Sequence, residues 1–147
     1  NFTYAGGNYV MNRTRSTLTD QIFFNSSTDI LRRWTQPGQE TDIPRVVSGD
    51  RLSFGGSTPI SEHVEKGDFL RLQNVSLSYN LPRKVLAFSK LNAVRVYGQI
   101  TNALLFTNYS GIDPEVSANG NSNTAPGVEY NTAGLGRTFT FGVNLTF

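Results

Sequence analysis

Cysteine is absent from the 147-residue sequence, and histidine and tryptophan each occur only once. Without cysteine the chain has neither a disulfide-stapled fold nor a thiol nucleophile. A zinc site would lack its usual cysteine and histidine ligands, so neither a metal nor a cofactor is expected. The sequence also lacks any run of about 18 apolar residues, which excludes a transmembrane helix.

Charge is sparse and evenly spread. The 13 basic and 11 acidic side chains leave a net charge of +2 and are scattered along the chain. A nucleic-acid-binding face needs clustered Lys and Arg, so no nucleic acid is expected as a partner. The sequence opens at Asn1 with no initiator methionine and no signal-peptide pattern. We therefore expect either a chain whose signal has been removed or a fragment of a longer protein.

The last ten residues alternate strictly between apolar and small polar side chains. The polar positions are Thr138, Thr140, Gly142, Asn144 and Thr146. The apolar positions between and after them are Phe139, Phe141, Val143, Leu145 and Phe147. This period of two predicts a β-strand with one apolar face. Its length fits the roughly 9–11 residues that cross a bilayer at a tilt.

Three earlier segments also have the pattern of strands. Residues 69–80 place Val75, Leu77 and Tyr79 on one face and polar side chains on the other, and residues 93–106 alternate similarly with Arg95 on the polar face. A charge at Arg95 suits a water-filled or plug-filled lumen better than a small sandwich core. Residues 1–10 predict a fourth strand, interrupted at Gly6-Gly7.

The connections between these strands differ in length. Residues 81–92 form a short turn, whereas residues 11–67 and 107–136 form long loops, as in outer-membrane barrels with short periplasmic turns and long outer loops. The first loop is expected to carry a short helix, capped by Ser26 or Ser27 and ended by Pro37-Gly38. Four strands cannot close a barrel, because the smallest closed set has about eight. The strand count therefore indicates a fragment.

Five separated motifs resemble those of one family, in the same order and spacing from Leu31 to Phe147. The first is Leu31-Arg-Arg-Trp34 with Thr41-Asp-Ile-Pro-Arg45, and the second is the stretch from Val64 to Pro82. The third is Val94-Arg-Val-Tyr-Gly-Gln99 with Thr101-Asn-Ala-Leu-Leu-Phe-Thr107. The fourth is Tyr109-Ser-Gly-Ile-Asp-Pro-Glu-Val116, and the fifth is the terminal strand. In these motifs the chain resembles the C-terminal region of the SusC/RagA-like TonB-dependent transporters of Bacteroidetes outer membranes.

The resemblance implies an all-β fold: the last four antiparallel strands of a transmembrane barrel of about 22 strands, with long extracellular loops. It also implies import of oligosaccharides or oligopeptides beneath a SusD-like surface lipoprotein, driven by the TonB complex through a plug domain that this chain lacks. Outer-membrane lipid and the barrel-assembly machinery are further implied partners. No enzymatic activity is implied.

The terminal stripe of Phe139, Phe141, Val143, Leu145 and Phe147 resembles the C-terminal signal read by the barrel-assembly machinery. The physical reason is strand addition, since an alternating edge strand ending in an aromatic residue can pair with an open strand edge. The alternative interpretation is a soluble strand that ends in phenylalanine by chance.

The loops contain three candidate contact residues. Asp113 and Glu115 could bind a cation or a sugar hydroxyl, although Asp113-Pro114 more simply predicts a turn. Trp34 could stack on a sugar ring, but a tryptophan in a short helix more often packs that helix onto the barrel rim or a partner subunit. Glycan or peptide contact at these three residues is therefore a hypothesis.

No catalytic machinery is predicted. His63, the only histidine, lies beside Glu62 and Glu65 in a polar loop, and we expect it to be a solvated surface residue. General acid–base catalysis would need such a base in a closed pocket. The sequence also lacks the Gly-x-Ser-x-Gly pattern of a nucleophile elbow.

A secreted β-sandwich that binds glycans is the alternative from a different functional class. It predicts that the apolar stripe of residues 139–147 is buried against a second sheet. The barrel segment predicts that the same stripe stays open for lipid.

Overall fold

The computed structural model describes residues 1–19, 25–45, 60–87, 91–120 and 125–147. The chain divides into two compact units. The first, which we call the strand unit, comprises Asn1–Ala5, Phe69–Phe106 and Leu135–Phe147. The second, the loop unit, comprises Gly6–Asp68 and Thr107–Gly134. Each is described separately below.

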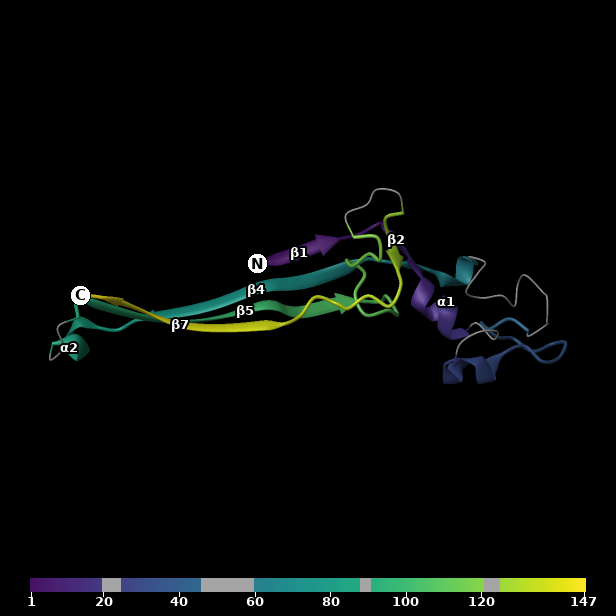
Figure 1. Cartoon of the computed structure of the whole chain (residues 1–147), viewed down its shortest axis with the longest axis horizontal. Coiled ribbons are helices and arrows are strands. Elements are labelled where there is room, and N and C mark those ends of the chain that lie inside the picture. Colours follow the sequence, from purple (N-terminus) through teal and green to yellow (C-terminus); the bar gives the residue numbers. More distant parts are fainter. Residues whose placement is uncertain (20–24, 46–59, 88–90, 121–124) are drawn as a thin grey trace. The chain divides into compact units, whose positions relative to one another are not determined.

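The strand unit is built on one four-stranded sheet with the strand order β1-β4-β5-β7. These strands are β1 (Phe2–Ala5), β4 (Phe69–Asn80), β5 (Ala93–Thr107) and β7 (Thr138–Thr146). The short helix α2 (Arg83–Leu86) lies in the connection between β4 and β5. Strands β4, β5 and β7 run side by side over much of their length (Figure 1). The fold is thus mostly strand, as the alternating sequence predicts.

Register aligns the apolar positions of β5 and β7 on one face of the sheet. The strands pair antiparallel, with Val94 opposite Leu145, Val96 opposite Val143 and Ile100 opposite Phe139. Directly opposed residues in a sheet point to the same side. The polar positions of β7 consequently share the other face with Arg95, Tyr97, Gln99 and Thr101.

A β-bulge in β4 keeps the apolar residues before and after it, from Leu70 to Tyr79, on that same face. The backbone N–H groups of Gln73 and Asn74 both donate to the carbonyl of Asn1, at 2.9 and 3.4 Å. Two residues opposing one is the signature of a bulge, which inserts an extra residue and shifts the alternation by one. Leu70 and Leu72 before the bulge therefore face the same way as Val75, Leu77 and Tyr79 after it.

Two glycines leave space for aromatic rings across the pair of strands β5 and β7. Gly98 lies opposite Phe141 and Tyr97 lies opposite Gly142. A Cβ atom on Gly98 would lie 3.3 Å from the Phe141 ring, and one on Gly142 would overlap the Tyr97 ring. Each ring thus occupies the space left by a missing side chain, one ring on each face. Such pairs fix the register of β7 against β5.

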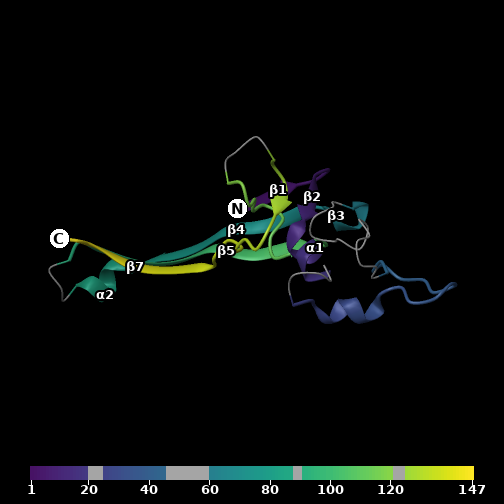
Figure 2. The same ribbon diagram turned by 45° about the vertical axis from the view of Figure 1, so that its right-hand side comes forward.

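The loop unit contains a second, three-stranded sheet with the order β3-β2-β6. Its strands are β2 (Tyr9–Asn12), β3 (Val64–Lys66) and β6 (Val128–Glu129), with β2 antiparallel to β3 and parallel to β6. Helix α1 (Arg13–Thr19) continues directly from β2 (Figure 2), and two 3-10 helices follow, η1 (Thr28–Arg32) and η2 (Ser61–His63). Within the described ranges, no helix is both long and apolar enough to cross a membrane.

The structure differs from the predicted strand over residues 1–10. Two strands, β1 and β2, replace it and belong to different sheets. Gly7 adopts a φ of 84°, a left-handed conformation that ends a strand, and its N–H donates to Oδ1 of Asp68 at 2.7 Å. The Gly6-Gly7 interruption is therefore a break between two sheets.

The predicted outer loops also contain regular structure. β2, α1 and β3 lie wholly or partly within residues 11–67, and β6 lies within residues 107–136. In the first loop, η1 begins after Ser27, whose side chain accepts from the N–H of Asp29, and its helical residues end at Arg32, before Trp34. Residues 20–24, 46–59, 88–90 and 121–124 of the predicted loops and turn lie outside the described residues.

Candidate functional site

The strand unit exposes an apolar face. Phe141 and Phe147 are each 81% exposed, and Leu77 is 79% exposed. Phe139, Val143 and Leu145, on the same stripe of β7, are 50% to 59% exposed. Soluble monomers rarely expose apolar patches larger than a few hundred Å². This face is therefore suited to contact with another apolar phase or surface.

The opposite face of the same sheet is polar and internally hydrogen-bonded. The Arg95 guanidinium donates to Oγ of Ser78 at 2.9 Å. Oδ1 of Asn74 accepts from the Gln99 amide at 3.4 Å and from the Thr101 hydroxyl at 3.3 Å. A sheet with one apolar and one hydrated face suits the wall of a membrane barrel, which separates hydrocarbon from a polar interior.

The sandwich alternative predicts the reverse for β7. Its stripe should be buried against a second sheet, yet the five residues from Phe139 to Phe147 on that stripe are 50% to 81% exposed. The described structure therefore disfavours the secreted sandwich.

Glu65 on β3 organises the polar centre of the loop unit. Its carboxylate accepts from the Ser110 N–H at 2.9 Å, the Ser110 hydroxyl at 2.7 Å and the Asn12 amide at 3.2 Å. Burial alone would raise the pKa of Glu65, but the hydrogen bonds from Ser110 and Asn12 and the charge of Arg15 outweigh it and lower the pKa. The carboxylate thus joins three segments that are distant in sequence.

Arginine side chains link the same centre to the first loop. The Arg15 guanidinium lies 3.3 to 3.4 Å from carboxylate oxygens of Asp42, Glu62 and Glu65. Arg32 pairs with Asp42 at 2.9 Å, and this hydrogen bond lowers the pKa of Asp42. Arg15 therefore has its charge neutralised by neighbouring carboxylates.

His63 is buried, contrary to the prediction of a solvated residue. It is 4% exposed, and its Nδ1 atom has no hydrogen-bond partner in the described part of the chain. Burial lowers the pKa of His63, and the positive charge of Arg15 lowers it further. The negative charges of Glu62 and Glu65 act in the opposite direction but do not outweigh these two effects. In a catalytic triad the Nδ1 atom would be oriented by a carboxylate. Within the described ranges no carboxylate contacts Nδ1 of His63. The burial of this residue was not foreseen, because a single histidine among polar neighbours in sequence gives no signal of it.

Trp34 is half-buried beside a cavity of about 370 Å³ that Thr41, Asp42, Ile43, Pro44 and Arg45 also line. Its backbone N–H donates to the carbonyl of Ile43 at 3.0 Å. Trp34 is thus held by its backbone to the segment that follows it, and both line this cavity.

Asp113 is buried and takes part in a turn. Its Oδ1 accepts from the N–H of Glu115 at 3.1 Å, the arrangement of an Asx turn, while the Glu115 side chain is exposed. In the described residues, no group of three or more His, Cys, Asp or Glu side chains is placed to hold a metal ion. Asp113 and Glu115 are not among the described residues that line the cavity beside Trp34.

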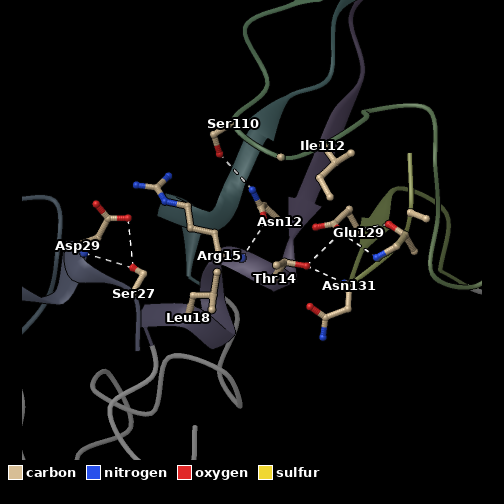
Figure 3. Close-up of a pocket in the computed structure, with 13 residues that line it drawn as sticks. Asn12, Thr14, Arg15, Leu18, Ser27, Asp29, Ser110, Ile112, Glu129 and Asn131 are labelled. Atoms are coloured by element: carbon tan, nitrogen blue, oxygen red, sulfur yellow. Dashed lines mark hydrogen bonds between the residues drawn. The ribbon is translucent and has the colours of Figure 1, made fainter. Parts of the chain in front are cut away.

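A larger cavity of about 850 Å³ lies within the loop unit (Figure 3). Asn12, Thr14, Arg15 and Leu18 from the β2–α1 segment line it together with Ser110, Ile112, Glu129 and Asn131 from the second loop. None of the three predicted loop contacts lines it. Sequence reasoning missed Glu129 because its partner Thr14 is 115 residues away.

The chain is similar in sequence to proteins described as TonB-dependent receptors. The chain is 38% identical over 128 residues to TonB-dependent receptor P3 of Formosa agariphila, covering 84% of the chain and 12% of that receptor. It is 36% identical over 150 residues to TonB-dependent receptor P26 of the same organism, covering 99% of the chain and 15% of that receptor. The chain thus spans less than one sixth of these relatives. It matches no protein-family model.

Solved structures give the same result. The RagAB peptide importer in its open-open state aligns with a TM-score of 0.75 at 28% identity, over 99% of this chain and 15% of that one. The RagAB peptide transporter aligns with a TM-score of 0.75 at 29% identity, over the same shares. Sequence and fold agree over nearly the whole chain, and the two-faced sheet matches a piece of a barrel. The chain is a segment of a SusC/RagA-like TonB-dependent receptor.

Proposed function

We propose that this chain is the C-terminal barrel segment of an outer-membrane transporter that imports oligopeptides or oligosaccharides with a SusD-like surface lipoprotein. The two-faced sheet is the observation that carries the proposal, because it has one side suited to lipid and one suited to a hydrated lumen. The structural match to a peptide importer with a TM-score of 0.75 supports it, and makes peptides the first substrates to test.

The connections support an orientation in the membrane. β1 is antiparallel to β4 and β5 is antiparallel to β7, so the long connections over residues 6–68 and 108–137 join strand ends on one side of the sheet. The short connection with α2 joins β4 to β5 at the other side. Long connections are typical of the outer side of such barrels and short turns of the periplasmic side. We therefore propose an outer-membrane protein whose long connections face the cell exterior and whose short connection faces the periplasm.

The proposal gives this segment a structural role within a longer transporter. TonB would act on a plug domain outside this chain, and the surface lipoprotein would meet the outer loops. The segment supplies barrel wall and loops, with no chemical step of its own.

Uptake by cells tests the transport proposal. A strain lacking the full-length protein should lose uptake of a tryptic digest of a soluble protein or of an oligosaccharide digest, and the restored gene should recover it. A matched strain expressing the protein without its TonB-interacting segment should remain deficient. Unchanged uptake of both digests in the deleted strain would contradict the proposal.

The terminal stripe of Phe139, Phe141, Val143, Leu145 and Phe147 serves in this proposal as the assembly signal. Phe147 is 81% exposed and follows the last residue of β7. Replacing Phe147 with alanine should lower the outer-membrane level of the full-length protein severalfold without changing its synthesis, because an aromatic anchor for strand addition is lost. Quantitative blotting of membrane and total fractions measures this.

Thr146→Ala is the matched control, since it alters the neighbouring residue on the polar face. It should leave the outer-membrane level unchanged. Equal levels for Phe147→Ala and the unaltered protein would rule out the assembly role.

A further inference from the structure

The Glu129 carboxylate is buried with only one of its oxygens satisfied. Glu129 is 1% exposed and lies on β6, where it pairs with Asn12 of β2. Oε1 accepts from the Thr14 hydroxyl at 3.0 Å and from the N–H and hydroxyl of Thr132 at 3.2 and 3.1 Å. Oε2 has no hydrogen-bond partner in the described part of the chain. A buried acceptor without a donor is costly, and a charged one more so.

Two arginine side chains of the loop unit have other partners. Arg15 lines the same cavity but is paired with Asp42, Glu62 and Glu65. The Arg13 guanidinium lies 5.0 Å from the centre of the Tyr130 ring.

The Tyr109 hydroxyl forms no hydrogen bond with Glu129. Burial raises the pKa of Tyr109, and the charges of Glu129 and Glu65 raise it further, so the hydroxyl stays protonated. It nevertheless has no hydrogen-bond partner in the described ranges. Oε2 of Glu129 is therefore a buried acceptor without a donor among the described residues.

Glu129 lines the cavity of about 850 Å³ in the loop unit. Figure 3 shows the Thr14 hydrogen bond to its carboxylate, with Asn12, Ile112 and Asn131 around it. Leu18, Ile112 and Ala133 contribute an apolar lining to the same cavity. A ligand that fits must combine a donor of positive charge with a short apolar body.

We infer that this cavity binds a primary ammonium group carried on a short aliphatic chain. The ammonium ion is a compact charge with three donors and needs only one acceptor oxygen to anchor it. A guanidinium group favours two parallel acceptors, whereas Oε1 of Glu129 is already occupied by three donors. Calcium would need six to eight oxygen ligands.

This inference goes beyond transport and does not depend on it. The ammonium could come from the amino terminus of a peptide or from a lysine side chain, which share the same chemistry. Because binding is measured without uptake, failure of the transport proposal would leave the result interpretable.

Isothermal titration of the detergent-purified full-length protein with n-butylammonium tests the site. We expect saturable binding of n-butylammonium and no detectable binding of the uncharged n-butanol. Glu129→Gln should weaken n-butylammonium binding roughly 10- to 100-fold, the range for losing a hydrogen bond to a charged group. The glutamine retains an oxygen for the three donors and places an NH₂ group where Oε2 was, so the fold should be kept.

Asp29→Asn is the matched control. Asp29 also lines the cavity, but its carboxylate is already paired with Arg32 at 2.9 Å. This variant should change n-butylammonium binding less than about threefold, whereas a general attraction to negative charge would make both variants equal. Circular dichroism confirms that both variants remain folded.

Competition separates the two sources of the ammonium group. Tetra-alanine carries a free α-ammonium, and acetyl-Ala-Ala-Lys-amide carries only the lysine ammonium. Displacement of n-butylammonium by either supports the inference and names the source. Equal binding to the folded Glu129→Gln variant, equal binding of n-butanol, or no binding of n-butylammonium to the unaltered protein would each overturn it.

Discussion

Arginine in place of Val143 should destabilise the membrane-inserted protein by about 2–4 kcal/mol, the cost of a cation on the lipid face near the bilayer midplane. Val143 lies on the apolar face opposite Val96 and next to Gly142, the middle residue of β7. It is 59% exposed in this chain, so arginine would fit there without steric conflict. The loss of stability would therefore come from the lipid around the apolar face and not from a steric clash within the protein.

Thr140→Arg supplies the matched control on the polar face. Thr140 lies opposite Gln99, which is uncharged, so the new arginine meets no like charge. Reversible urea unfolding from lipid bilayers should show a large loss for Val143→Arg and a change within about 0.5 kcal/mol for Thr140→Arg. Similar losses for the two variants would mean that β7 does not divide lipid from water.

Glu65→Ala should give the largest effect in the loop unit, lowering its stability by about 2–4 kcal/mol. The Glu65 side chain is mostly buried and accepts hydrogen bonds from Ser110 and Asn12 while pairing with Arg15. Its removal leaves these donors without their acceptor. Native-state hydrogen exchange should therefore show much faster exchange of the Ser110 N–H.

Glu40→Ala is the matched control, because Glu40 is exposed and is separate from this network. It should leave the Ser110 exchange rate unchanged. If Glu65→Ala also left Ser110 protected, the carboxylate would not be the centre of the loop unit.

The same network gives the loop unit a predictable dependence on acid. The folded pKa of Glu65 is lowered from its ordinary value of 4.5, so its stabilisation is complete above that value and is lost as the pH falls through the folded pKa. Protection of the Ser110 N–H, corrected for intrinsic exchange, should fall below pH 4.5 in the unaltered protein. This acid-dependent loss should be smaller in Glu65→Ala.

The strand unit was largely predictable because its signal is local. Alternation along residues 138–146 identifies the two faces of β7 without knowledge of any partner. The bulge at Gln73 and Asn74 was not predictable, since it depends on the carbonyl of Asn1, far away in sequence. The sequence pattern therefore indicated the two faces of the sheet. It did not indicate the bulge that keeps the apolar residues at both ends of β4 on one face.

The loop unit was poorly predictable because its contacts join distant segments. Met11 pairs with Val128, and Glu129 is held by Thr14, although neither short segment has a clear strand pattern. His63 has polar neighbours in sequence, and only the fold shows that it is buried. Tertiary pairing thus determined the cavity, and local propensity could not reveal it.

Single-cysteine labelling along β7 tests most directly whether the sheet separates lipid from water. The chain contains no cysteine, so no native thiol of this segment adds to the labelling of an introduced cysteine. In the membrane-inserted full-length protein, cysteines replacing Phe139, Phe141, Val143 and Leu145 should resist a water-soluble maleimide, while those replacing Thr140, Asn144 and Thr146 should react. Uniform reaction along the strand, or the opposite alternation, would contradict the barrel-wall account.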